Sequence, residues 1–256
     1  MSRQVFTNTR LRAACAAVAR EKLNLSTAAT LDLSGLSAAV TTGRIGLPTL
    51  QQMMSAEPVR ITLGGLAPAA FESARQLVSV AQSGVGREDN AASAQASLAL
   101  AVTQASARIG AVSRDITASA FAEAGAELGY KVDVCRGALA TGIEMRRGHE
   151  IVLMRVDNAG GVESDHAGLE DAVACGERQR ELEARAARKG VIVTARDEQH
   201  HGSSGGGALI RTAAARRDPS LARAVAVGVH PVATGPRRAF AEEPGRRRTR
   251  RVGGQP

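Results

Sequence analysis

One long helical repeat constrains the fold more than any other feature of the sequence. Between Ala91 and Leu128, apolar residues recur every three or four positions, the spacing that places side chains on one face of an α-helix. The repeat consists of Leu98, Val102, Ala105, Ile109, Val112, Ile116, Ala120, Ala124 and Leu128. Because many of these side chains are small, and because Gly110 and Gly125 interrupt the repeat, it favours a helical hairpin or bundle element over a free-standing coiled coil.

The scarcity of aromatic residues determines what kind of core can form. The 256 residues include four Phe, one Tyr and no Trp. The core must therefore be built from Ala, Val, Leu and Ile, and an aromatic stacking platform for single-stranded nucleic acid is nearly excluded. The sequence also contains no run of 18 apolar residues, so we expect no membrane-spanning helix.

Residues 1–112 are predicted to be a helical, Ala-rich region. Apolar residues over 5–23 recur at roughly helical spacing, and Pro68 suits the first turn of a helix over 68–82. Between these two helices, residues 58–63 alternate between polar and apolar side chains, which is typical of a strand.

Residues 113–195 are predicted to form a small α+β domain. Alternating segments bounded by glycine-containing turns predict strands, and an apolar face predicts a helix over 168–189. The expected strands cover 130–135, 138–145, 149–156, 161–164 and 191–194. We therefore expect an α+β fold in which a helical N-terminal region precedes a small antiparallel sheet packed with helices.

Charge placement separates the last quarter of the chain from the rest. Residues 1–195 carry 21 basic and 20 acidic residues, whereas residues 196–256 carry 12 Arg and 5 acidic residues. The second segment is rich in Gly and Pro and poor in large apolar side chains, so little burial offsets the entropy lost on ordering it. We expect residues 196–256 to be a disordered basic tail with a frayed helix near 221–229.

A segment that begins at residue 150 combines an apolar strand, a glycine turn and a capped helix with a cysteine. It reads Glu150-Ile151-Val152-Leu153, then Gly160-Gly161, then Asp165-His166-Ala167-Gly168-Leu169, and then Cys175. Over about residues 150–190 this pattern resembles a family of small bacterial proteins of unknown function, in which a β-hairpin precedes a capped helix. The resemblance implies this local fold and carries no established activity.

The candidates for a catalytic site are His149, Asp165, His166 and Cys175. Asp165 is predicted to cap the helix that follows it, and a helix N-terminus favours anions and lowers the pKa of a nearby thiol. Cys175 lies ten residues further, roughly 13 Å along the helix from the cap, so the two side chains are not expected to touch. We therefore expect Asp165 to be a helix cap and His166 to be exposed to solvent.

No cofactor and no metal are predicted. Asp197-Glu198-Gln199-His200-His201 offers oxygen and nitrogen ligands, but it adjoins a Gly-rich segment, and a structural zinc site needs a rigid set of about four ligands. Gly202–Gly207 lacks the Lys of a P-loop, and Gly84-Val85-Gly86 lacks the third Gly of a dinucleotide-binding loop. The three cysteines have no CxxC spacing and no signal peptide is evident, so we expect a cytoplasmic protein with reduced thiols.

The expected function is that of a non-enzymatic interaction or assembly protein. The helical face that carries Ile109, Val112 and Ile116 would meet either another copy of the chain or the small domain itself. One alternative is a nucleic-acid-associated protein that binds phosphates through an Arg-rich run in the tail, and another is an uncharacterised enzyme. The Arg-rich run consists of Arg246, Arg247, Arg248, Arg250 and Arg251. A protein partner or self-association is expected, and no membrane.

Overall fold

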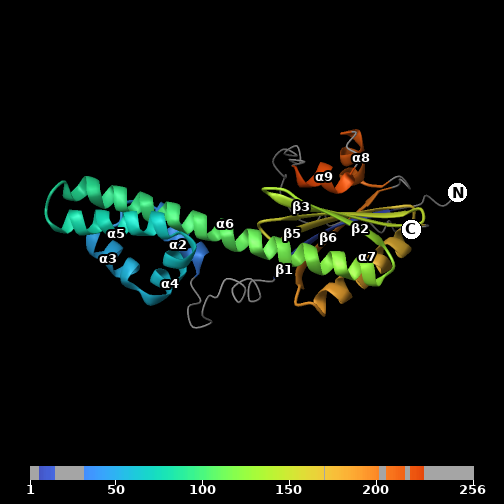
Figure 1. Ribbon diagram of the computed structural model, residues 1–256, viewed down its shortest axis with the longest axis horizontal. Coiled ribbons are helices and arrows are strands. Elements are labelled where there is room, and N and C mark those ends of the chain that lie inside the picture. The colour runs from blue at the N-terminus through green and yellow to red at the C-terminus, as the bar shows by residue number, and fades with distance from the viewer. Residues whose placement is uncertain (1–5, 15–31, 170, 202–205, 217–219, 228–256) are drawn as a thin grey trace, which may run out of the picture.

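A computed structural model of the chain describes residues 6–14, 32–169, 171–201, 206–216 and 220–227. Its helices are α2 (Leu33–Thr41), α3 (Leu47–Ser55), α4 (Glu57–Leu66), α5 (Pro68–Gln82), α6 (Arg87–Glu127), α7 (Ala172–Ala187), α8 (Ala208–Ala215) and α9 (Leu221–Ala226). Its strands are β1 (Phe6–Ala14), β2 (Lys131–Arg136), β3 (Ala140–Arg147), β4 (Glu150–Asp157), β5 (Gly161–Ala167) and β6 (Ile192–His201). Figure 1 shows an elongated molecule, with α2 to α5 at one end, the sheet at the other, and α6 running through both.

The strands form one antiparallel sheet in the order β2-β3-β4-β5-β1-β6. The strands β2 to β5 follow one another along the chain and are joined by short turns, as the sequence predicted. In the β4–β5 pair, Val152 lies opposite His166 and Leu153 lies opposite Asp165. This register places the candidate residues of β5 in the interior of the sheet.

Helices cover both faces of the sheet (Figure 1). On one face, α6 packs on β2, β3 and β4, and α7 packs on β1 and β6. On the other face, α9 packs on β2, β3 and β4, and α8 packs on β5. The core beneath α6 and α7 is aliphatic apart from two aromatic side chains, Phe121 and Tyr130. The predicted α+β class, a helical region followed by an antiparallel sheet packed with helices, is therefore confirmed.

The helical end of the molecule has a core of its own. Helices α2, α3, α4 and α5 all pack against the N-terminal half of α6. Fully buried members of this core include Leu50, Leu63, Ala74, Leu98 and Ala105. Small side chains let these helices approach one another closely, which matches the expectation of a core with few aromatic residues.

The two glycines that interrupt the helical repeat are points of close contact in α6. A Cβ atom on Gly125 would lie 2.5 Å from the Sδ atom of Met145 in β3, and one on Gly110 would overlap the backbone carbonyl of Asn158. Neither position has room for a side chain, because the sheet and the β4–β5 turn press directly on the helix. The helix continues through both glycines as a single element of 41 residues.

Two predicted elements of the N-terminal region were wrong. Residues 6–14 form the strand β1 instead of a helix, because β1 lies between β5 and β6 and exchanges backbone hydrogen bonds with both. Residues 58–63 belong to the helix α4, in which Pro58 occupies the first turn. The buried residues of α4 are Val59, Thr62, Leu63 and Leu66, which is a helical spacing.

The predicted domain boundaries can be located on the structure. The boundary at 112/113 falls inside α6, so the helical end and the sheet share one continuous helix. The folded part of the chain extends past residue 195, because β6 reaches His201 and both α8 and α9 pack on the sheet. Helix α9 lies so close to the sheet that a Cβ atom on Gly142 would overlap the backbone carbonyl of Ala222. The remainder of the predicted tail, residues 228–256, lies outside the described residues.

Within the described part of the chain, no helix is both long enough and apolar enough to cross a membrane.

Candidate functional site

The alternation of β5 separates the candidate residues onto the two faces of the sheet. Ser164 and His166 are fully buried and bond to Gln179 of α7. Asp165 is also fully buried, but it bonds to the backbone at the start of α8, on the opposite face. The structure therefore does not bring Asp165 and His166 together, although they are adjacent in sequence.

The predicted role of Asp165 as the cap of the next helix was wrong, because the residue lies inside β5. Helix α7 begins only at Ala172, and its cap is Asp171, whose carboxylate accepts a hydrogen bond of 2.8 Å from the Ala174 N–H. Asp165 instead caps α8 from across the fold. Its carboxylate accepts hydrogen bonds from the N–H of Gly207 at 2.7 Å and from the N–H of Ile210 at 3.0 Å.

The expectation that His166 is exposed was also wrong. Its ring lies between the sheet and α7, where Nε2 is 3.0 Å from the Oε1 atom of Gln179 and donates a hydrogen bond to it. Ser164 donates a second hydrogen bond to the same Oε1 atom, and Gln179 donates to Glu183. The Nδ1 atom of His166 is buried and has no hydrogen-bond partner among the described residues.

His149 and Cys175 both lie near the N-terminal end of α7, where Leu169 and Ala174 line the cavity next to His149 and also pack around Cys175. His149 is exposed and lines a cavity of about 230 Å³ together with Glu150, Glu177, Arg178 and Glu181. Cys175 is fully buried, in a small apolar cluster with Leu169 and Ala174. In the part of the chain that the structure describes, no group of three or more His, Cys, Asp or Glu side chains is placed to hold a metal ion.

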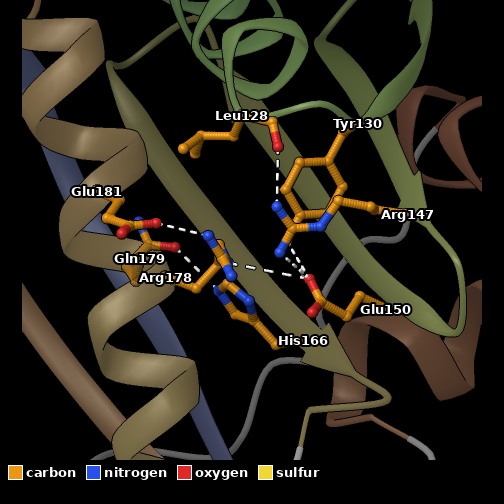
Figure 2. Close-up of polar contacts among 8 residues, drawn as sticks. All are labelled: Leu128, Tyr130, Arg147, Glu150, His166, Arg178, Gln179 and Glu181. Carbon is orange, nitrogen blue, oxygen red and sulfur yellow. Dashed lines mark hydrogen bonds and ion pairs between the residues drawn. The ribbon is translucent and has the colours of Figure 1, made fainter.

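Glu150 and Arg178 of this cavity wall belong to a charged cluster that sequence reasoning missed (Figure 2). Glu150 is its centre: it accepts hydrogen bonds from the hydroxyl of Tyr130 at 2.6 Å and from Arg147 at 2.8 Å. The guanidinium of Arg147 lies 4.7 Å from the centre of the Tyr130 ring, and Arg178 of α7 lies 3.9 Å from Glu150. Tyr130 is the single tyrosine of the chain, but no sequence motif links it to Arg147, Glu150 and Arg178.

The electrostatics of this cluster give it a structural role. Burial and the hydrogen bond to Glu150 raise the pKa of Tyr130 well above its ordinary value of 10.0. Burial raises the pKa of Glu150, but the hydrogen bonds from Tyr130 and Arg147 outweigh burial, and the net shift is downward. At neutral pH the phenol is therefore protonated and the carboxylate ionised. Charge-assisted contacts of this kind hold α7 against the β3–β4 hairpin.

The buried histidine predicts a pH-dependent stability. Burial lowers the pKa of His166 in the folded chain below the ordinary value of 6.5, which the unfolded chain keeps. At a pH between the folded and the unfolded pKa, the unfolded chain therefore binds a proton that the folded chain does not. We expect the free energy of unfolding to fall as the pH is lowered below about 6.5, by up to about 1.4 kcal/mol per pH unit. Urea unfolding between pH 5 and pH 8 measures this dependence.

A matched pair of variants tests whether His166 causes the pH dependence of the free energy of unfolding. In His166→Gln the side chain does not titrate, so the loss of stability between pH 7 and pH 5 should disappear. In His149→Gln it should persist, because His149 is exposed. A wild-type stability that is flat over this range would contradict the prediction.

A second cavity, of about 530 Å³, lies at the helical end of the molecule. It is lined by the loop between α2 and α3 and by the first turns of α6. Gln95 of α6 shapes this loop, because it donates hydrogen bonds to the carbonyls of Val40 and Gly43 and accepts one from the Ile45 N–H. Arg44 and Glu88 at its mouth have side chains that are 86% and 89% exposed, so the mouth is a solvated rim.

Three further sequence candidates are the possible metal ligands at 197–201, the Arg-rich run and the expected partner face, and the structure describes only some of their residues. Residues 197–201 belong to the strand β6, at the edge of the sheet. The Arg-rich run at 246–251 lies outside the described residues. The expected partner face is largely occupied within the chain: Ile116 is buried, and Ile109 packs on the core of the helical end.

The chain was compared with protein-family models, with curated proteins and with solved structures, and none of the three comparisons found a match.

Proposed function

We propose that this chain is a non-enzymatic interaction or assembly protein that binds its partner through the outer side of α6. The proposal is supported by one observation, the absence of charge from a long and partly exposed section of this helix. From Asn90 to Ala107, 18 consecutive residues include no Asp, Glu, Lys or Arg, in a chain of which 23% is charged.

The two sides of this section have different surroundings. Its inner side packs on α2 to α5 through Ala94, Leu98, Ala101, Val102 and Ala105. Its outer side is exposed, and we call it the uncharged face: Ser93, Ala96, Leu100, Gln104 and Ala107. Leu100, at the centre of this face, is 52% exposed. Because the uncharged face has no charged side chain and exposes a large apolar one at its centre, we expect it to be covered in the assembled protein.

Position-specific crosslinking tests this proposal. A photoreactive residue in place of Leu100, in the full chain and in the cells that produce it, should form an adduct with a polypeptide that mass spectrometry identifies. The control position is Leu139, which is 62% exposed and lies between β2 and β3. An adduct at 100 and none at 139 supports the proposal. Equal adducts, or none, at both positions would reject it.

Nucleic-acid binding through the C-terminal segment is the second candidate function. It is favoured by the five arginines among residues 246–251. We expect duplex DNA or RNA to bind with an affinity that falls steeply as salt rises, and deletion of 237–256 to abolish the binding. Fluorescence anisotropy over a salt series measures both effects, with circular dichroism as the control for folding. A truncated chain that binds as well as the full chain would exclude this candidate.

A further inference from the structure

We infer that the partner of the uncharged face is a second copy of the same chain, which packs its own α6 against it in the antiparallel direction. This inference rests on the proposed function and specifies its partner. It follows from the arrangement of side-chain sizes and charges along the exposed side of α6.

The side chains of the face are complementary to themselves in the antiparallel direction. When two copies of α6 are related by a two-fold axis at the level of residue 98, Ala96 of each copy lies opposite Leu100 of the other. A large side chain then meets a small one on both sides of the axis, which is how packed helices fill space. Ser93 and Ala107, towards the two ends of the face, are small as well and allow the helices to approach.

The charged residues at the two ends of the uncharged face also favour antiparallel packing. Asp89 lies one helical turn before Ser93, on the same side of α6 as Leu100, and Arg108 directly follows Ala107; both are exposed. In the antiparallel arrangement Asp89 of one copy lies beside Arg108 of the other, twice per dimer. A parallel arrangement would instead place like charges together, which is unfavourable.

The size of the contact sets the expected dissociation constant of the dimer. The face extends over about 21 Å of helix from Ser93 to Ala107, at 1.5 Å per residue. A contact of this length is smaller than a standard stable interface, so we expect a reversible dimer with a dissociation constant on the order of micromolar.

Sedimentation of the full chain over a concentration series tests the location of the interface. Wild type should pass reversibly from monomer to dimer. Leu100→Arg places a charge at the centre of the face and should raise the dissociation constant about tenfold or more. Leu139→Arg, an exposed leucine distant in sequence, should leave it unchanged. A dimer that survives Leu100→Arg would place the interface elsewhere and overturn the inference.

A charge exchange tests the direction of packing. Asp89→Arg and Arg108→Asp should each weaken the dimer several-fold, and the double variant should restore it because the opposite charges are paired again. All three variants change only exposed side chains, so folding is expected to be retained, and circular dichroism checks it. Failure of the double variant to restore dimerisation would contradict antiparallel packing.

The outcomes separate this inference from the proposed function. If the chain stays monomeric while the photoreactive residue at position 100 captures a different polypeptide, the second copy is wrong and the interaction function stands. If the captured polypeptide is the chain itself and the charge exchange succeeds, both are supported. If neither association nor an adduct at position 100 is found, both are rejected.

Discussion

Replacement of Asp165 by alanine is expected to lower the free energy of unfolding by about 3 kcal/mol and to release α8 from the sheet. The carboxylate of Asp165 is fully buried and accepts hydrogen bonds from the backbone N–H groups of His166, Gly207 and Ile210. An alanine would leave these N–H groups without an acceptor, and each buried unsatisfied group costs about 1–3 kcal/mol. The opened end of α8 recovers part of this cost by contact with water.

Urea unfolding measures the change in stability, and hydrogen exchange over residues 206–216 reports the release of α8. Asp171→Ala is the matched control, because Asp171 also caps a helix but is exposed to solvent. The control should lose only about 1 kcal/mol, the usual effect of a lost cap. Equal losses for the two variants, or unchanged exchange in α8, would show that Asp165 does not hold this helix.

Replacement of Arg114 by methionine is expected to destabilise the fold by about 3 kcal/mol. Arg114 lies in the middle of α6, and its side chain is only 7% exposed. Its Nη1 atom contacts the carbonyls of Gly137 and Ala138 at 3.0 and 3.2 Å and the Oδ1 atom of Asn158 at 3.1 Å. One side chain thus joins α6 to both the β2–β3 turn and the β4–β5 turn, and methionine fills the volume without replacing the donors.

The measurement is again the free energy of unfolding, with Arg60→Met as the control. Arg60 lies on the exposed side of α4, so its replacement should change stability by no more than about 0.5 kcal/mol. Because Arg114 holds the β2–β3 turn against α6, the variant should also increase hydrogen exchange at residues 137–138. An Arg114→Met protein as stable as Arg60→Met would contradict this role.

Local patterns in the sequence predicted the elements that local interactions stabilise. The helix at 68–82 and the strands from β2 to β5 lie within a few residues of their expected positions. Their signals were a proline in the first helical turn, helical or alternating spacing, and glycines such as Gly129 and Gly160 at positive φ in the turns. Each of these signals acts over fewer than ten residues, so the sequence alone is sufficient to detect it.

The elements that were mispredicted, or predicted only as a frayed helix, depend on distant partners. Residues 6–14 are a strand because β5 and β6, more than 140 residues away in sequence, pair with both of their edges. Residues 208–215 and 221–226 carry few large apolar side chains, yet they fold because the sheet supplies a surface for Leu209, Ile210 and Val225. Sheet carboxylates also help to hold both helices in place: Asp165 at the start of α8 and Glu144 at the N–H of Leu221.

The candidate site also has features that local sequence predicts and features that depend on distant parts of the chain. The sequence identified His149, Asp165, His166 and Cys175 by their proximity along the chain, but the period of two in a strand points Asp165 and His166 to opposite faces. Tyr130, Arg147 and Arg178 come from three separate elements and have no common motif, so only the folded chain shows that they surround Glu150.

The long Ala-rich repeat by itself determined that a helix would dominate this protein, and the scarcity of aromatic residues determined that its core would be aliphatic. The tertiary structure decided that this helix is continuous and that Gly110 and Gly125 are contacts and not breaks, because the sheet packs against its backbone there. The tertiary structure also decided which side of α6 the other helices and the sheet cover. Periodicity shows that a helix has an apolar side, whereas only the arrangement of the other elements determines whether they cover it.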